Sequence, residues 1–455
     1  MSQKQTDYLG RQARYESNAR MYPRSIPVAI SRARGVHVTD TGGHTYLDCL
    51  AGAGTLALGH NHPVAIEAMR RLLDDGSPLH TLDLATPTKD GFAETLLESL
   101  PDELAGRAKI QFCGAAGADA VEASVKLVKT ATGDTQMLSF HGGFHGMTHG
   151  ALSLSGNLKP KEPVGALMPE VQFLPYPSEY RCPFGIGGGE GHRVGSRYIE
   201  RMLDDPESGV KSPAGMILEA VQGEGGVNPA PDEWLSEIRR ITAERGIPLI
   251  LDEVQAGIGR TGRMYAFEHA GIVPDAVVLS KAIGGSLPLA VVVYDESLDQ
   301  WQPGAHSGTF RGNQLAMAAG EATIRHILEE RLYEHAEEMG ERLMAGLREV
   351  QRAARSIGEV RGRGLLAGAE VVDPEAAPDN LGSHPANPAL ADLIQSECLK
   401  RGLILETGGR HGAVLRFLPP LIVTESDVDR ICEIVGESVV AAEKHANPSD
   451  LPEAG

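Results

Sequence analysis

The amino-acid sequence predicts an α/β protein with two domains: a large one, built on a mostly parallel sheet covered by helices, and a smaller α+β domain formed by the N- and C-terminal segments. The chain has 455 residues, which is too long for one ordinary domain. From about Pro63, apolar runs of strand length alternate with amphipathic stretches of helix length. After about Gly358 the pattern becomes a compact mixture of short strands and helices. We therefore place the N-terminal part of the small domain at 1–62, the large domain at 63–331 and the C-terminal small domain at 332–455.

The first predicted element is a hairpin between Gly35 and Leu50, with its turn at Thr41–Gly43. The large domain follows, and its apolar periodicity changes between 3.6 and 2 along the chain. The predicted elements are helices at 65–75, 94–100, 119–132 and 232–246, and strands at 109–114, 136–140, 215–222, 248–254, 275–281 and 289–295. The glycine-rich run 185–191 follows no strand, so we interpret it as a flexible loop.

The second half of the chain ends in helices. A loop after His306 leads into an apolar-periodic helix that ends near Arg331, and a longer amphipathic helix continues to about Arg355. The C-terminal domain is then predicted to contain a strand at 360–372, a helix at 389–402, two short strands and a last helix at 427–445.

Composition narrows the function to small-molecule chemistry. Lys and Arg total 42 against 61 Asp and Glu, which gives a formal charge of −19. Such an acidic chain is not expected to bind nucleic acid or anionic membranes without sequence preference. The five cysteines are widely spaced and contain no C-x-x-C pair, so reduced thiols in the cytoplasm are expected rather than disulfides or a metal site. The N-terminus lacks an apolar signal core, and no run approaches the length of a spanning helix.

Two residues at strand ends carry the strongest chemical signal. Asp252 ends one apolar run and Lys281 ends the next, and glycine-rich turns follow both. Ends of neighbouring parallel strands meet at one edge of a sheet, where α/β proteins bind ligands. A lysine among apolar neighbours can become a nucleophilic amine, and an aspartate is the partner that a protonated pyridine nitrogen requires. The pair therefore predicts a pyridoxal 5′-phosphate (PLP) site.

Two other interpretations of these strings compete with a PLP site. A Ser-Lys dipeptide after a strand is more often a solvated helix start than a catalytic site. The string PLILDEV also resembles a Walker B strand, but that interpretation requires a P-loop. The chain contains no Gly-Lys dipeptide, so a nucleotidase is excluded.

A possible phosphate site lies where the strand 109–114 leads into the helix 119–132. The small residues between them leave the first helical amides, at Gly117, Ala118 and Asp119, able to bind an anion. Gly-Ala turns are common helix entries, so the string alone is a weak signal.

The segment FHGGFHGMTHG allows a metal site or an aromatic contact. His141, His145 and His149 are spaced so that a helix would place them on one face, as zinc requires. The four glycines in the segment argue against such a helix, so no metal is predicted. The preferred interpretation is a loop in which Phe144 stacks on a flat heterocycle.

Three charged residues suggest how a substrate binds. Glu219 and Glu224 lie five residues apart at a strand end, and Arg416 lies inside an apolar run of the small domain. A lone arginine in such a run needs a partner, and a carboxylate matches its geometry. Glu224, a substrate carboxylate or a purely structural ion pair could each supply it.

Taken together, these strings resemble class III aminotransferases, the fold-type I PLP enzymes, over nearly the whole chain. The most specific strings are LDEVQAGIGRTG and SKAIGGSLP. The resemblance implies a covalent bond from Lys281 to PLP, pairing of Asp252 with the pyridine nitrogen, and an approach of Gln255 to the phenolic oxygen. It also implies ring stacking by Phe144 with His145 beside it.

The resemblance extends to the phosphate, the subunit boundary and the substrate. Gly117 and Ala118 would bind the cofactor phosphate, and Thr309 would reach the phosphate of the neighbouring subunit's cofactor in a homodimer, possibly paired into a tetramer. Glu224 and Arg416 would form a gate in which the arginine pairs either with the glutamate or with the carboxylate of 2-oxoglutarate or L-glutamate. Glu219 is followed by alanine where the family usually has proline.

Loop strings such as LAGAGTLALGHNHP and LPYPSEYRCPFG are most similar to members of the family that act on L-2,4-diaminobutyrate. The expected reaction is L-aspartate 4-semialdehyde plus L-glutamate to L-2,4-diaminobutyrate plus 2-oxoglutarate. Transamination of another ω-amino acid (ornithine, 4-aminobutyrate or lysine), and a PLP-dependent aminomutase on the same scaffold, are the alternatives.

Overall fold

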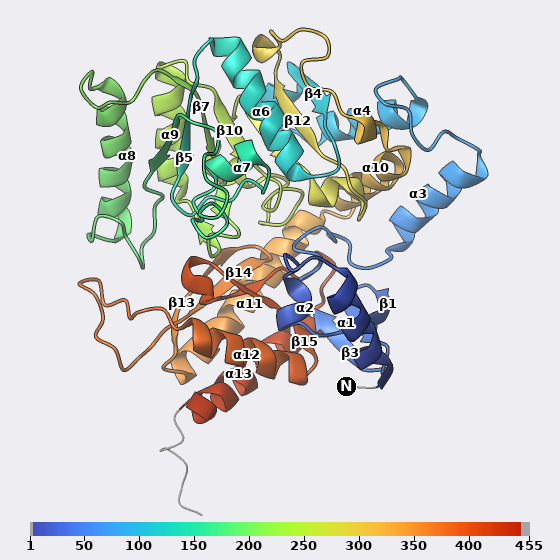
Figure 1. Ribbon diagram of the computed structural model, residues 1–455, viewed down its shortest axis with the longest axis vertical. Helices are drawn as coiled ribbons and strands as arrows, with labels where there is room; N and C mark the ends of the chain where they lie inside the picture. Colours follow the sequence, from blue (N-terminus) through green and yellow to red (C-terminus); the bar gives the residue numbers. More distant parts are fainter. Residues whose placement is uncertain (1–2, 447–455) are drawn as a thin grey trace, which may run out of the picture. The chain divides into compact units, whose positions relative to one another are not determined.

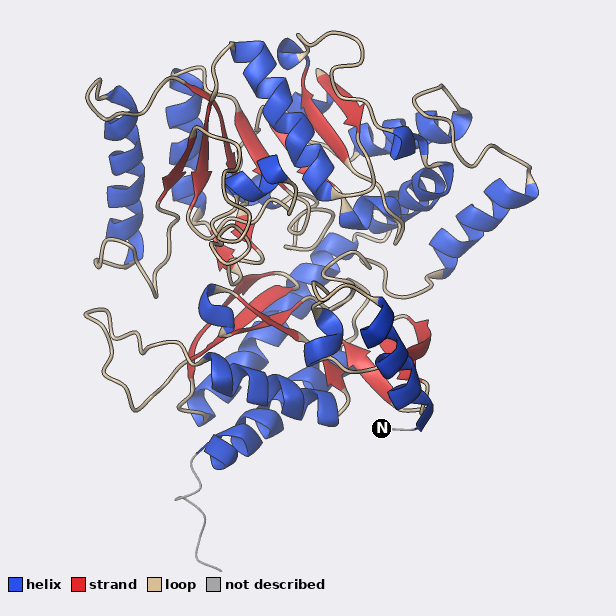
Figure 2. Cartoon of the chain, in the orientation of Figure 1, coloured by secondary structure: helices blue, strands red, loops and turns tan. Residues whose placement is uncertain are grey.

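The computed structural model describes residues 3–446 and divides into two compact units. One unit comprises 63–334, and the other comprises the described parts of 1–62 and 335–455. Figures 1 and 2 show the elements of both.

The unit 63–334 is built on a seven-stranded sheet of order β4-β12-β11-β10-β7-β5-β6. Only β12 runs antiparallel to its neighbours, so the other six strands share one direction and the predicted, mostly parallel sheet is confirmed. The strands are β4 (Ala108–Phe112), β5 (Gln136–Phe140), β6 (Val171–Leu174), β7 (Pro213–Leu218), β10 (Leu249–Asp252), β11 (Ala276–Leu279) and β12 (Val291–Asp295).

Two crossover helices cover this sheet. The connection from β4 to β5 runs through α6 (Gly117–Thr132), and the connection from β7 to β10 runs through α9 (Asp232–Glu244). The two connections progress along the sheet in opposite directions, and such crossovers are right-handed, so α6 and α9 lie on opposite faces. A buried apolar cluster packs α6 on the sheet through residues such as Val121, Leu127 and Ile217. Each fully buried side chain of this size stabilises the fold by about 1.5–3 kcal/mol.

The remaining helices of this unit are α3 (Pro63–Asp74), α4 (Pro87–Glu98), α5 (Asp102–Ala105), α7 (His149–Leu154), α8 (Gly188–Asp204) and α10 (Gln314–Glu329). Helix α8 corrects the prediction for 185–191, because the second half of that glycine run forms the first turn of the helix. Glycine is tolerated there because the first turn has few intrahelical hydrogen bonds to lose. Only 185–187 remain loop.

The other unit contains two four-stranded sheets, of order β1-β2-β3-β15 and β13-β14-β17-β16. The hairpin predicted in the N-terminal segment is confirmed as β2 (His37–Asp40) and β3 (Thr45–Asp48). The other strands are β1 (Ile30–Arg34), β13 (Ile357–Arg363), β14 (Leu366–Val371), β15 (Leu403–Ile404), β16 (Glu406–Gly408) and β17 (Val414–Phe417). The helices are α1 (Gln3–Tyr15), α2 (Tyr22–Ser25), α12 (Pro388–Lys400), α13 (Glu425–Ala446) and most of α11 (Leu332–Ala353).

The strand predicted at 360–372 is wrong as a single strand. The chain turns back after Arg363, and β13 pairs antiparallel with β14. Gly364 takes a left-handed conformation, with φ +54°, which a glycine adopts without steric cost. The turn therefore divides the apolar run into a hairpin. No helix within 3–446 is long and apolar enough to cross a membrane.

Candidate active site

The candidate site is assembled from loops that follow parallel strands of the seven-stranded sheet. The carboxyl ends of such strands lie at one edge, so the segments after β4, β5, β7, β10 and β11 gather there. In the same order, these segments carry Gly117, His145, Glu219, Asp252 and Lys281.

Asp252 and His145 form a buried pair. The imidazole Nδ1 of His145 lies 2.8 Å from Asp252 Oδ2, and both residues are at most 5% exposed. The backbone amide of Val254 donates a hydrogen bond of 3.1 Å to the other carboxylate oxygen. Burial alone would lower the pKa of His145, but the hydrogen bond and charge of Asp252 raise it above its ordinary value. These contacts fix the orientation of the Asp252 carboxylate at the sheet edge.

Glu219 is a second buried acid in this region. Its two carboxylate oxygens accept hydrogen bonds of 3.0 Å from the amides of Phe144 and Gly223. Burial, and to a lesser extent the nearby charge of Asp252, raise the pKa of Glu219, whereas His145 and the two amides lower it, and the net result is a pKa of about 7. The sequence placed Glu219 at a strand end but gave it no role. Its bonds position the loop that carries Phe144 and the turn that leads to Glu224.

Lys281 begins a short 3-10 helix, Lys281–Gly284, directly after β11. Asp252 pairs in register with Val278, three residues before this lysine, so the two charged residues follow adjacent strands. The backbone of Lys281 has φ +50°, an uncommon conformation for a residue with a side chain, and such strain is frequent at functional sites. Ser280 Oγ donates to the carbonyl of Leu289 at 2.9 Å and fixes the turn before the lysine.

The predicted phosphate site is the first turn of α6. Its N-cap is Ala116, whose side chain cannot accept a hydrogen bond from the first helical amides. A methyl group added to Gly117 would lie 3.1 Å from Val254 and 3.4 Å from the Cβ of Ser280. The helix start is thus packed against the residues that follow Asp252 and precede Lys281. This arrangement fits PLP, whose phosphate requires amides at a helix start while its ring nitrogen requires a carboxylate.

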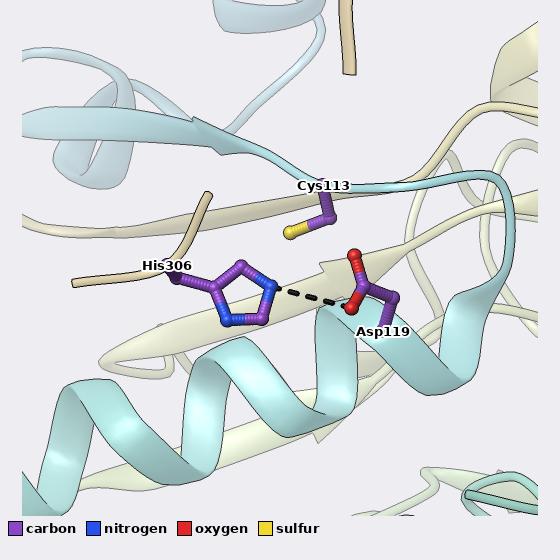
Figure 3. Close-up of side chains that lie close together, drawn as sticks. All are labelled: Cys113, Asp119 and His306. Carbon is purple, nitrogen blue, oxygen red and sulfur yellow. Dashed lines mark ion pairs between the residues drawn. The ribbon is translucent and has the colours of Figure 1, made fainter. Parts of the chain in front are cut away.

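A side-chain cluster borders this phosphate site. Asp119, in the first turn of α6, accepts a hydrogen bond of 2.5 Å from the amide of Gly114 and lies 3.4 Å from His306 Nε2 (Figure 3). The thiol of Cys113 lies in the same group, within 4.8 Å. Sequence reasoning named Asp119 only as a helical amide and gave no role to Cys113 or His306.

The remaining predicted cofactor residues lie in the same unit. Gln255 is 8% exposed, in the turn after β10. Thr309 is exposed and begins the 3-10 helix Thr309–Gly312, followed by Phe310, which is 70% exposed. The histidines at 141, 145 and 149 do not share a helical face, since only His145 is buried and α7 begins at His149.

Arg416 lies in the other unit and has a partner that the sequence did not reveal. It is fully buried in β17, and its Nη1 lies 2.9 Å from Glu406 Oε1 on β16. The two residues are directly opposite each other in the antiparallel register. A methyl group at Gly408 would lie 2.6 Å from Arg416 Cδ, so this glycine makes room for the arginine. Glu224 is half-buried in the turn between β8 (Val221–Gln222) and β9 (Asn228–Pro229), in the unit 63–334.

The fold is that of a transaminase. An amine transaminase from an uncultivated Pseudomonas species, solved in its PLP-bound form, has a TM-score of 0.84 and 26% identity; the match covers 94% of this chain and 97% of that one. An ornithine aminotransferase from Toxoplasma gondii matches with a TM-score of 0.81 and 25% identity, over 97% of this chain and 95% of that one.

Sequence comparison identifies the family. The model of the class-III aminotransferases matches residues 19–439, so this chain belongs to that family. A diaminobutyrate–2-oxoglutarate aminotransferase of Rhizobium meliloti is 59% identical over 93% of this chain and 90% of the relative. A protein of the same name from Haemophilus influenzae is 52% identical over 96% of both chains.

Proposed function

We propose that this protein is a PLP-dependent aminotransferase that converts L-aspartate 4-semialdehyde and L-glutamate to L-2,4-diaminobutyrate and 2-oxoglutarate. The observation that carries the chemistry is the register of β10 and β11, which brings the buried Asp252–His145 pair beside β11, the strand that leads to Lys281. The identity of 59% to an enzyme named for diaminobutyrate and 2-oxoglutarate supports the choice of substrates.

PLP supplies an electron sink to the carbon that exchanges its amine, and the protein residues hold and protonate the reactants. In our proposal Lys281 would hold the cofactor through its amine, and the same amine would move the proton at the substrate carbon that exchanges its amino group. Asp252 keeps the pyridine nitrogen protonated, and His145 fixes that carboxylate through their 2.8 Å contact. Phe144 would stack on the ring, and Gln255 would approach its phenolic oxygen.

The phosphate and the substrates have their own proposed residues. The amides of Gly117 and Ala118 bind the cofactor phosphate at the start of α6. Arg416 binds the carboxylate of L-glutamate or 2-oxoglutarate, and Glu224 acts in the diaminobutyrate half-reaction. Glu406 remains beside Arg416 throughout, because the guanidinium group has five donors and can serve two carboxylates.

We further propose a cytoplasmic homodimer in which Thr309 of each subunit contacts the cofactor phosphate of the other, with pairing into tetramers possible. Residues 63–331 would form the cofactor-binding domain, and 1–62 with 332–455 the smaller domain.

A panel of amine donors tests the function. Purified protein with PLP is given 2-oxoglutarate and, in separate reactions, L-2,4-diaminobutyrate, ornithine, 4-aminobutyrate or lysine, and glutamate formation is measured. Diaminobutyrate is expected to have the highest kcat/KM. A higher value for another donor assigns the protein to a different ω-amino acid. Rearrangement of diaminobutyrate without added 2-oxoglutarate identifies an aminomutase instead.

A further inference from the structure

The cluster of Cys113, Asp119 and His306 joins two segments that are distant in sequence (Figure 3). Asp119 belongs to α6 and holds the amide of Gly114 through one carboxylate oxygen. Its other oxygen lies 3.4 Å from Nε2 of His306, whose side chain is only 10% exposed. Asp119 therefore connects the phosphate site with the segment 302–309, which we call the strap.

The same three side chains offer a thiol, a carboxylate and an imidazole, the donors that zinc prefers. Two observations argue against a cation. The ammonium group of Lys126 lies 3.4 Å from His306 Nδ1, so Nδ1 is placed to accept a hydrogen bond from it, while Nε2 is the ring nitrogen that faces Asp119. Burial also raises the pKa of Cys113 well above its ordinary value, which keeps the thiol protonated. The cluster is better suited to hold segments together than to bind a metal.

The strap is attached firmly around His306. The carbonyl of His306 accepts hydrogen bonds of 3.1 Å from Gln111 Nε2 on β4 and from Arg311 Nη1. Lys126 on α6 donates to the carbonyl of Ala305. These bonds fix one part of the strap on β4 and α6, and the strap ends three residues later at the exposed Thr309.

Asp119 is in an unusual electrostatic position. A carboxylate in the first turn of a helix is normally stabilised by the helix dipole. Here the same turn is the proposed site of a phosphate, and a second negative group would repel the aspartate. The two carboxylate oxygens of Asp119 contact the amide of Gly114 and the imidazole of His306, so its negative charge is balanced by these groups and not by the amides that would bind the phosphate. A bound phosphate should therefore strengthen the contact between Asp119 and His306.

We propose that Asp119 is a positioning residue that, through His306, couples the phosphate site of one subunit to the strap that presents Thr309 to the other subunit's cofactor. This proposal rests on the shared dimeric site proposed above. Its consequence is that a change at Asp119 in one subunit alters cofactor affinity in the other subunit, whose own residues are all unchanged.

Hybrid dimers test this coupling. One subunit carries Lys281→Ala and the other is wild type, so absorbance from cofactor bound covalently to lysine reports only the wild-type subunit's site. Asp119→Asn is added to the Lys281→Ala subunit, and the apo-hybrid is titrated with PLP. The wild-type subunit's site is called the reporting site. We expect its affinity for PLP to fall by about 2- to 30-fold, the usual range for coupling through a contact network.

Three further hybrid dimers test whether the loss of affinity is specific to the contact between Asp119 and His306. In each of them the additional substitution is placed in the Lys281→Ala subunit. Lys109→Gln is the matched control, because it removes an ion pair with Asp299 at the start of β4 and should leave the affinity unchanged. His306→Gln should reproduce the loss caused by Asp119→Asn, and the double variant should lose no more than either single one. Thr309→Trp should weaken binding strongly, because the side chain obstructs the shared site.

The outcomes separate the two proposals. If Thr309→Trp weakens the reporting site but neither Asp119→Asn nor His306→Gln does, the coupling is wrong and the shared site stands. If Thr309→Trp has no effect, the shared site is wrong, and the coupling proposal falls with it. Equal losses for Asp119→Asn and Lys109→Gln would reduce Asp119 to a general structural residue and overturn its positioning role.

Discussion

Replacing Arg416 by methionine should destabilise the protein because it leaves the buried Glu406 without its arginine. At their separation of 2.9 Å and an effective dielectric constant of about 20, two unit charges attract by about 6 kcal/mol. Much of that attraction offsets the cost of removing both charges from water. Deleting one partner of such a pair therefore costs about 3–5 kcal/mol of the free energy of unfolding. Arg416 is fully buried and Glu406 is 4% exposed, so water cannot replace the lost partner.

The test is a double-mutant cycle. The free energy of unfolding is measured in urea by circular dichroism, at one fixed PLP concentration, for wild type, Arg416→Met, Glu406→Gln and the double variant. Each single change should be strongly destabilising, and the double variant should regain most of the loss, because no buried charge remains unpaired. Additive losses, or a loss below about 1 kcal/mol for Arg416→Met, would refute this reasoning.

The same variants separate a structural role from a substrate role. Arg416→Met should slow the half-reaction with glutamate, while Glu406→Gln should leave an arginine still able to bind a carboxylate. Stopped-flow measurement of the two half-reactions distinguishes them. Loss of stability with an unchanged glutamate half-reaction would make Arg416 a structural residue only.

Three further predictions concern the unit 63–334. Lys281→Ala should leave a folded protein that still binds PLP but has no covalent link to it, and borohydride reduction of the wild type followed by peptide mapping should label Lys281 and no other lysine. Asp252→Asn should retain PLP yet lower turnover by several orders of magnitude, because a neutral amide cannot keep the pyridine nitrogen protonated; near-normal steady-state rates would contradict this role. Burial raises the pKa of Glu253 to about 8, so the folded state binds its proton more tightly than the unfolded state does. The stability of the wild type relative to Glu253→Gln should therefore fall as pH rises from about 4.5 to 8, by at most about 1.4 kcal/mol per pH unit. Urea unfolding at several pH values measures this, and a difference that grows with pH would show that the carboxyl pKa is not raised.

Local pattern was sufficient to predict the parallel sheet and the positions of Asp252 and Lys281. Both residues end apolar runs of strand length, and parallel strands present their carboxyl ends at one edge. The pairing of Asp252 with His145 could not be predicted, because it joins the end of β10 to a loop more than 100 residues away in sequence. Their contact depends on the order of strands in the sheet, which neighbouring residues do not encode.

Strand register, a tight turn and a glycine-rich helix start explain the other features that the sequence pattern did not predict. Glu406 ends an apolar run just as Asp252 does, so an acidic residue at such a position was a usable signal. Its pairing with Arg416 depends on the alignment of β16 with β17, which pattern alone does not fix. The apolar residues of 360–372 suggested one long strand because Gly364 was not recognised as a turn. Likewise, the start of α8 was not predicted, because its glycines do not show the apolar periodicity by which a helix is predicted.

The division of the proposed site residues between two parts of the chain has an evolutionary consequence. Every residue that we assign to the cofactor lies between 117 and 309, within one compact unit, whereas Arg416 belongs to the other. Mutations in 335–446 can therefore change how a substrate carboxylate is bound without altering the residues assigned to cofactor chemistry. Descendants of a common ancestor that adopt a different 2-oxo acid should diverge around β16 and β17, while the loops after β10 and β11 stay nearly constant. A laboratory search for new 2-oxo acid acceptors would best begin with libraries at residues 404–418 that keep Arg416 and Glu406.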